Sequence, residues 1–103
     1  MRSPNSVVYR NLDASDALTH TINQKFNRLS RFTRHIQHGR IILDSPHNHR
    51  HKGKVFRAQI ELEVEGQPIT ISQDKPSIHV AVRDAFSAAE RKLKALNEQR
   101  HYH

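Results

Sequence analysis

The amino-acid sequence predicts an α+β domain with the element order β-α-β-β-β-α, in which two helices pack on one face of a four-stranded sheet. Two segments have the apolar spacing of amphipathic helices, and between them one segment alternates strictly between apolar and polar side chains. A sheet with one polar face needs cover only on its other face, so both helices belong on the same side. Because a chain of about one hundred residues encloses one modest core, we expect residues 1–103 to form a single domain.

The first strand and the first helix follow from residue type and spacing. Residues 6–10 are rich in β-branched and aromatic side chains, which favours a strand. Asp13 or Ser15 provides the N-cap of a helix that we expect to run to about His35. The apolar stripe of this helix repeats every three or four residues and consists of Leu18, Ile22, Phe26, Leu29, Phe32 and Ile36.

The second and third strands are expected on either side of a histidine-rich loop. Gly39 should end the first helix before a second strand at residues 40–44. The loop at residues 45–53 has turn-forming residues at both ends. Residues 55–65 alternate between apolar and polar, which predicts a long strand with one solvated face. Its buried side should carry Phe56, Ala58, Ile60, Leu62 and Val64.

A fourth strand at residues 69–71 and a second helix complete the predicted fold. Asp74, Pro76 and Ser77 are typical of residues that precede a helix. Both helices then present their polar sides outward, next to each other. The apolar stripe of the second helix should contain Ile78, Val82, Ala85, Phe86, Ala89, Leu93 and Leu96.

The outward sides of the two helices are predicted to merge into one basic patch. The chain has a formal net charge of +7, and it has no acidic residue between Ala17 and Leu43. A surface of one charge repels itself, and a phosphate backbone is the commonest partner of such a surface. We therefore predict a polyanion-binding patch that contains Lys25, Arg28, Arg31 and Arg34 of the first helix and Arg83, Arg91, Lys92 and Lys94 of the second.

Recognition through stacked RNA bases is not expected. The chain has four phenylalanines, and Phe26, Phe32, Phe56 and Phe86 all fall on apolar stripes. Only Tyr9 and Tyr102 are expected to be free to stack. Because readers of single-stranded RNA need stacking platforms, the patch should recognise the shape of an RNA backbone.

The histidine-rich loop is the one place where a metal site is conceivable. His47, His49 and His51 alternate, so an extended chain would place them on one side. Imidazole suits zinc, copper or nickel, but a closed zinc site requires four ligands. Asp44 is the best candidate for a fourth ligand, and because the ligand count falls short we expect no metal and no cofactor. The alternative is an auxiliary phosphate-binding loop in which the histidines act with Arg50, Lys52 and Lys54.

Catalytic, secreted and membrane classes of protein are disfavoured. The three glycines sit singly, so no glycine-rich phosphate loop is present. Glu61, Glu63 and Glu65 share the polar side of one strand, where carboxylates usually serve solubility. The chain has no cysteine, no apolar signal core and no apolar run of about 18 residues. We expect a cytoplasmic protein that is soluble and is not an enzyme.

Two motifs and their order resemble a known protein family. The first is KFNRLSRF at 25–32, and the second joins AVRDAF at 81–86 to AERKLK at 89–94. With the order β-α-β-β-β-α, they resemble the ribosome hibernation-promoting factor and ribosome-associated inhibitor A family over residues 5–100. Residues 45–66 are similar to the branch that carries a histidine-rich loop, and the length is that of a short form.

The resemblance implies a stress or stationary-phase factor. Such a factor binds the small ribosomal subunit where mRNA and the decoding-site tRNAs lie, inhibits translation and protects idle ribosomes. We expect it to be monomeric off the ribosome, with no membrane and no small-molecule substrate as partner. The best-known short members carry an acidic, an aromatic and a lysine residue where this chain has Ser77, His79 and Ala88. By position, the residues that would contact rRNA are Lys25, Arg28, Arg31, Arg91, Lys92 and Lys94.

Two other functions remain open on the sequence alone. A stand-alone double-stranded-RNA-binding module could use the same kind of fold and basic helix pair, and it should bind free RNA helices of about 16 base pairs. A protein–protein regulator would use the patch on an acidic partner, and the family has been described as modulating an alternative sigma factor. Displacement from small subunits by mRNA or initiator tRNA distinguishes the hibernation factor from the RNA-binding module, and the protein–protein regulator predicts no RNA in the purified complex.

Overall fold

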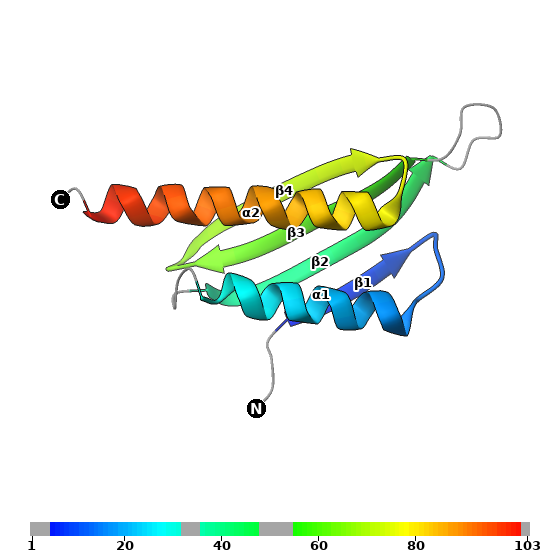
Figure 1. Ribbon diagram of the computed structural model, residues 1–103, viewed down its shortest axis with the longest axis horizontal. Helices are drawn as coiled ribbons and strands as arrows, with labels where there is room; N and C mark the ends of the chain where they lie inside the picture. Colours follow the sequence, from blue (N-terminus) through cyan, green and yellow to red (C-terminus); the bar gives the residue numbers. More distant parts are fainter. Residues whose placement is uncertain (1–4, 32–35, 48–54, 102–103) are drawn as a thin grey trace.

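The structure is a computed structural model that describes residues 5–31, 36–47 and 55–101. It has the β-α-β-β-β-α order that the sequence predicts, and both helices cover one face of a four-stranded mixed sheet (Figure 1). The elements are β1 (Asn5–Arg10), α1 (Asp16–Leu29), β2 (Ile36–His47), β3 (Val55–Val64), β4 (Gln67–Lys75) and α2 (Ile78–His101).

The strands lie in the order β1-β2-β3-β4. β1 and β2 pair in parallel, and α1 is the crossover that parallel neighbours require. β2, β3 and β4 are antiparallel neighbours. Figure 1 shows α1 and α2 running in the same direction along the sheet, and Phe26 of α1 packs against Phe86 of α2. The outward sides of the two helices are therefore neighbours.

α1 begins where Ser15 caps it. The Ser15 Oγ accepts a hydrogen bond from the Leu18 backbone N–H at 3.1 Å, which satisfies one free donor of the first turn. Tyr9 of β1 fixes this end, because its hydroxyl donates to the Ser15 carbonyl at 2.9 Å and lies 2.7 Å from the Thr19 Oγ1. Of the two N-caps that the sequence allows, Asp13 and Ser15, the structure selects Ser15.

The prediction that the first helix runs to about His35 is wrong. α1 ends at Leu29, and Ile36 begins β2 and pairs with Val64 of β3. Pairing with β3 lengthens β2 to twelve residues, well beyond the predicted strand. At Ile36, pairing with β3 outweighs the preference for a helix, because intrinsic helix propensity is weak compared with tertiary contacts. Phe32, another member of the predicted stripe, lies outside the described residues.

Gly39 lies within β2 and does not end a helix, which also corrects the prediction. It pairs with Leu62 of β3 and with Asn5 of β1. A Cβ at this position would lie 2.6 Å from the Asn5 Oδ1 and 3.0 Å from the Phe26 Cε1. The missing side chain therefore lets α1 pack close to the sheet through Phe26.

β3 confirms the predicted alternation, and β4 is longer than predicted. Phe56 is only partly buried, and the fully buried members of its side are Ala58, Ile60, Leu62 and Val64. β4 has nine residues because its polar residues also pair with β3, with Ser72 opposite Gln59 and Asp74 opposite Arg57. Asp74, which was predicted to precede the second helix, therefore belongs to the sheet.

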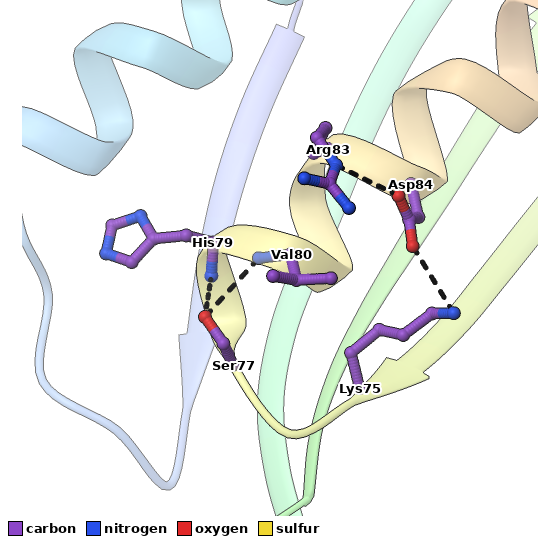
Figure 2. Close-up of polar contacts among 6 residues, drawn as sticks. All are labelled: Lys75, Ser77, His79, Val80, Arg83 and Asp84. Carbon is purple, nitrogen blue, oxygen red and sulfur yellow. Dashed lines mark hydrogen bonds and ion pairs between the residues drawn. The ribbon is translucent and has the colours of Figure 1, made fainter.

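The core lies between the sheet and the two helices. α2 follows Ser77, whose Oγ accepts hydrogen bonds from the backbone N–H groups of His79 and Val80 at 3.2 and 3.4 Å (Figure 2). Ile78 and Leu96 of the predicted stripe are partly buried. The buried residues of the predicted α2 stripe are Val82, Ala85, Phe86, Ala89 and Leu93. Neither α1 nor α2 is long and apolar enough to cross a membrane.

The other face of the sheet, which we call the open face, carries alternating charges. Arg57 donates from Nε and Nη2 to the two carboxylate oxygens of Asp74, at 2.8 and 3.0 Å. Hydrogen bonding to Asp74 raises the pKa of Arg57 above its ordinary value, and the nearby charge of Asp44 adds to this. Arg40 and Glu61 form a second pair at 2.7 Å. One row across the four strands contains Arg10, Asp44, Arg57 and Asp74.

Candidate nucleic-acid interface

A groove between the outward sides of α1 and α2 gathers cations from both helices. It contains a cavity of about 150 Å³. Because a water molecule occupies about 30 Å³, the cavity has room for a small polyatomic anion. We call it the basic groove, and its lining consists of Lys25, Arg28, Arg83, Phe86, Ser87 and Glu90. The structure thus brings together three of the residues that were predicted to contact a polyanion.

Arg28 and Glu90 form an ion pair across the basic groove. The Arg28 Nε lies 3.1 Å from the Glu90 Oε2, and the two side chains are 67% and 26% exposed. A pair this well hydrated stabilises a fold by only about 0–1 kcal/mol. The contact is made at Nε, the inner nitrogen of the guanidinium, and not at the terminal Nη groups.

Arg83 is held by a carboxylate on the α2 side of the basic groove. Its Nε donates a hydrogen bond to the Asp84 Oδ1 at 3.1 Å, and the Lys75 Nζ lies 3.3 Å from the Asp84 Oδ2 (Figure 2). The hydrogen bond from Arg83, followed by that from Lys75, holds the pKa of Asp84 below its ordinary value of 3.8. Because Lys75 ends β4, this small network also ties α2 to the sheet.

A shallower hollow of about 330 Å³ on α1 shares Lys25 and Arg28 with the basic groove. Arg31 lies at its end in the turn after α1, where its backbone N–H donates to the Arg28 carbonyl at 3.0 Å. Arg31 was predicted to lie on the helix, and the early end of α1 corrects this. Cations and amide side chains together suit phosphate and sugar groups of RNA. The hollow is lined by Thr21, Gln24, Lys25, Asn27, Arg28 and Arg31.

The remaining predicted contacts of α2 do not all lie beside the basic groove. Arg91, Lys92 and Lys94 are exposed. Lys94 is about three turns beyond Arg83, so it continues the same side of the helix. Lys92 is about two and a half turns from Arg83, so it lies on the opposite side. Arg34 lies outside the described residues.

The auxiliary loop that was predicted to bind phosphate falls mostly on the part of the chain that is not described. Asp44, the candidate fourth metal ligand, accepts a hydrogen bond from the Asn11 Nδ2 at 3.0 Å. Within residues 5–31, 36–47 and 55–101, no three histidine, cysteine or acidic side chains gather as metal ligands would. His47 ends β2, and the loop residues outside the described part are His49, Arg50, His51, Lys52 and Lys54.

Sequence reasoning missed the carboxylates of this interface and misjudged one aromatic residue. Glu90 stands four residues before Lys94, which is typical of a solubilising pair on a helix and gives no sign of a partner on α1. Asp84 likewise gave no sign of its contact with β4. Tyr9 was predicted to be free for base stacking, but its hydroxyl is hydrogen bonded and its ring packs against the core.

Comparisons with known proteins agree with this fold. Among protein families, the chain matches Sigma 54 modulation protein / S30EA ribosomal protein over residues 6–101. A search of curated proteins gives no match. The chain is similar to the solved N-terminal domain of Protein Y from Thermus thermophilus, with a TM-score of 0.74 and 20% identity, covering 93% of this chain and 99% of that chain. It is also similar to a ribosomal subunit interface protein from Coxiella burnetii, with a TM-score of 0.64 and 17% identity, covering 90% and 98%.

The two solved structures are 20% and 17% identical to this chain, so they establish the fold alone. The family match also establishes the family to which the chain belongs. That match extends from β1 to the end of α2, so it includes both helices that line the basic groove. It does not separate branches of the family, so the branch with a histidine-rich loop stays a prediction. The chain belongs to the Sigma 54 modulation protein / S30EA ribosomal protein family, a family of ribosome-associated proteins that act in ribosome hibernation and translation inhibition.

Proposed function

We propose that this chain binds the small ribosomal subunit through the basic groove and inhibits translation by occupying the channel for mRNA and the decoding-site tRNAs. The observation that carries the proposal is the convergence of Lys25, Arg28 and Arg83 from two helices around one cavity. Cations grouped in this way suit the closely spaced phosphates of folded rRNA. Occupying a channel requires no chemical step, which agrees with the non-enzymatic character of the family.

The distribution of charge supports binding through the helices and not through the sheet. On the open face, Arg40 and Arg57 are each paired with a carboxylate, Glu61 and Asp74 respectively. Each of these two arginines donates through both Nε and Nη2, so a phosphate approaching this side would have to displace the carboxylate. On the helices, Arg28 and Arg83 meet their carboxylates at Nε, and Lys25 adds a further cation beside them, so a polyanion should be drawn to the basic groove.

The groove favours recognition of backbone shape. The rings of Phe26 and Phe86 are buried, and the hydroxyl of Tyr9 is bonded within the fold. Base stacking needs an exposed aromatic face, which none of these three rings offers. We accordingly propose a single ribosome-binding domain that acts as a monomer in the cytoplasm and protects idle ribosomes during stress or stationary phase.

Co-sedimentation with purified ribosomal subunits in sucrose gradients tests this function. We expect the protein to move with small subunits and to be displaced by mRNA together with initiator tRNA. The competing function is a stand-alone double-stranded-RNA-binding module. Equal binding to a free RNA duplex of about 16 base pairs, without displacement by mRNA, would support that module and contradict the proposal.

A further inference from the structure

Each of the two arginines of the basic groove is paired through its Nε with a carboxylate from α2. The Arg28 Nε lies 3.1 Å from the Glu90 Oε2. The Arg83 Nε lies 3.1 Å from the Asp84 Oδ1. In both pairs the contact is made at the inner nitrogen of the guanidinium. The terminal Nη groups, which form the fork that binds phosphate oxygens, are the ones left to meet another anion.

Carboxylates are unexpected at a surface that binds phosphate, because each one repels the ligand. Two features indicate that these carboxylates fix the arginines in place, although Asp84 lies outside the lining of the groove. Glu90 itself lines the cavity beside Arg28 and Lys25. Asp84 is anchored a second time, by the Lys75 Nζ at the end of β4 (Figure 2). An anchored carboxylate can fix an arginine that would otherwise sample many rotamers.

We propose that Glu90 and Asp84 are positioning residues, which hold Arg28 and Arg83 through Nε so that the Nη groups of both arginines bind one phosphate group of the RNA backbone in the basic groove. This inference rests on the proposed function, because the phosphate belongs to the rRNA. Ordering a long side chain before binding saves about 0.5–1.5 kcal/mol of the cost of binding, which corresponds to roughly a two- to tenfold gain in affinity.

The variant Glu90→Gln separates the positioning hypothesis from simple electrostatics, because the two predict opposite changes in affinity for small subunits. Simple electrostatics expects Glu90→Gln to tighten binding, because a negative charge leaves a basic surface. Positioning expects binding to small subunits to weaken by roughly two- to tenfold. Glu98→Gln is the matched control, because Glu98 is exposed on the same helix and its removal changes the net charge equally. It should tighten binding slightly. Asp84→Asn should weaken binding as Glu90→Gln does.

The dependence of affinity on salt provides the second measurement. In Glu90→Gln the slope of log affinity against log salt should stay as in the wild type. Arg28 still reaches its phosphate in this variant, although its side chain must then become ordered during binding. Arg28→Gln should lower both the affinity and the slope, the latter by about 0.7–0.9. In the Arg28→Gln background, Glu90→Gln should no longer weaken binding, because the two residues act as a unit.

Binding of the wild type tests the proposed function, and binding of Glu90→Gln tests the positioning role of Glu90. A wild-type protein that does not bind small subunits would overturn the proposed function and this inference with it. A wild-type protein that binds, together with a Glu90→Gln variant that binds as tightly as or more tightly than the wild type, would overturn the inference alone. A urea unfolding midpoint unchanged in Glu90→Gln would show that a loss of affinity is not a loss of fold.

Discussion

The ring of Phe26 on α1 meets the ring of Phe86 on α2 edge to face, with centroids 5.0 Å apart and planes at 84°. This is a preferred arrangement of aromatic pairs. Both residues are buried, at 4% exposure, and Phe86 also lines the basic groove. The contact that joins the two helices in the core therefore also sets the spacing of the cations above it.

Phe86→Ala should destabilise the protein by about 3–5 kcal/mol, because it removes a buried aromatic side chain and leaves a cavity. Small domains have only about 5–15 kcal/mol of stability, so this is a large part of the total. Urea unfolding followed by circular dichroism measures the effect. Ser87→Ala, one residue further on and exposed, is the control and should stay within about 0.5 kcal/mol. A loss below about 1 kcal/mol for Phe86→Ala would contradict the packing.

Arg83→Gln and Lys92→Gln remove the same charge from opposite sides of α2. Arg83 lines the basic groove, and Lys92 does not. Arg83→Gln should weaken binding to small subunits by roughly tenfold, as expected for the loss of one charge-assisted hydrogen bond. Lys92→Gln should change it by less than about twofold. Equal losses in the two variants, measured by fluorescence anisotropy, would mean that position on the helix does not matter.

Binding to small subunits should weaken steeply as salt is added. Each cation that neutralises a phosphate releases counterions, with a slope of about −0.7 to −0.9 per contact. Six contacts would give a slope of about −4 to −5 for log affinity against log salt. A titration with potassium chloride at constant pH measures the slope. A value near zero would exclude binding through phosphates.

The pairing of Glu61 with Arg40 should make stability depend on pH in the acidic range. Two bonds from Arg40, at 3.0 and 2.7 Å, and a weaker contribution from Gln59 lower the pKa of Glu61 below its ordinary value of 4.5. Because the folded-state pKa is the lower one, the pair stabilises the protein above about pH 4.5, and this contribution is lost as the pH falls through the folded-state pKa.

Between neutral and acidic pH, the free energy of unfolding should therefore fall less in Glu61→Gln than in the wild type. The side chain of Glu61 is 33% exposed, so the effect should not exceed about 1 kcal/mol. Urea midpoints measured from pH 7 to pH 3 test this. Glu63→Gln, two residues further along the same strand, is the control for removing a carboxylate. Parallel curves for Glu61→Gln and the wild type would show that the pair has no influence.

The histidine-rich loop should make ribosome binding depend on pH. Histidine titrates near pH 6.5, so acidification from pH 7.5 to 6 charges up to three imidazoles beside Arg50, Lys52 and Lys54. Affinity for small subunits should rise over this range. Replacing His47, His49 and His51 by glutamine should flatten the rise. A pH profile unchanged by the triple substitution would mean that the loop has no part in binding, and a profile flattened only by chelators would indicate a metal.

The fold could be predicted from the sequence wherever a segment carried a single pattern, either helical spacing or strict alternation. The strict alternation in β3 and the helical spacing of α2 both appeared where expected, because burial on one face dictates such patterns. The boundary between α1 and β2 was misplaced because Ile36 fits a helical stripe and also pairs with Val64. The end of β4 was missed because Ser72 and Asp74 are polar and owe their strand conformation to their partners on β3.

The candidate site was only half predictable for a similar reason. A run of cations without carboxylates is visible in a sequence, so Lys25 and Arg28 could be selected from charge alone. The pairing of Arg28 with Glu90 depends on the distance between two helices, which no local pattern encodes. Lys92 was included with the binding residues through the family resemblance, and its place on the opposite side of α2 from Arg83 makes it the weakest member of that set.

The matched charges of the open face have a consequence for stoichiometry. A protein that meets RNA with its helices turns the open face outward, where Arg57 already lies between Asp44 and Asp74. Arg40 and Arg57 are already paired with carboxylates there, so a bound molecule should contact one particle through its helices and not bridge two particles. Among the described residues, the helices therefore form the binding side, and one molecule should hold one polyanion at a time.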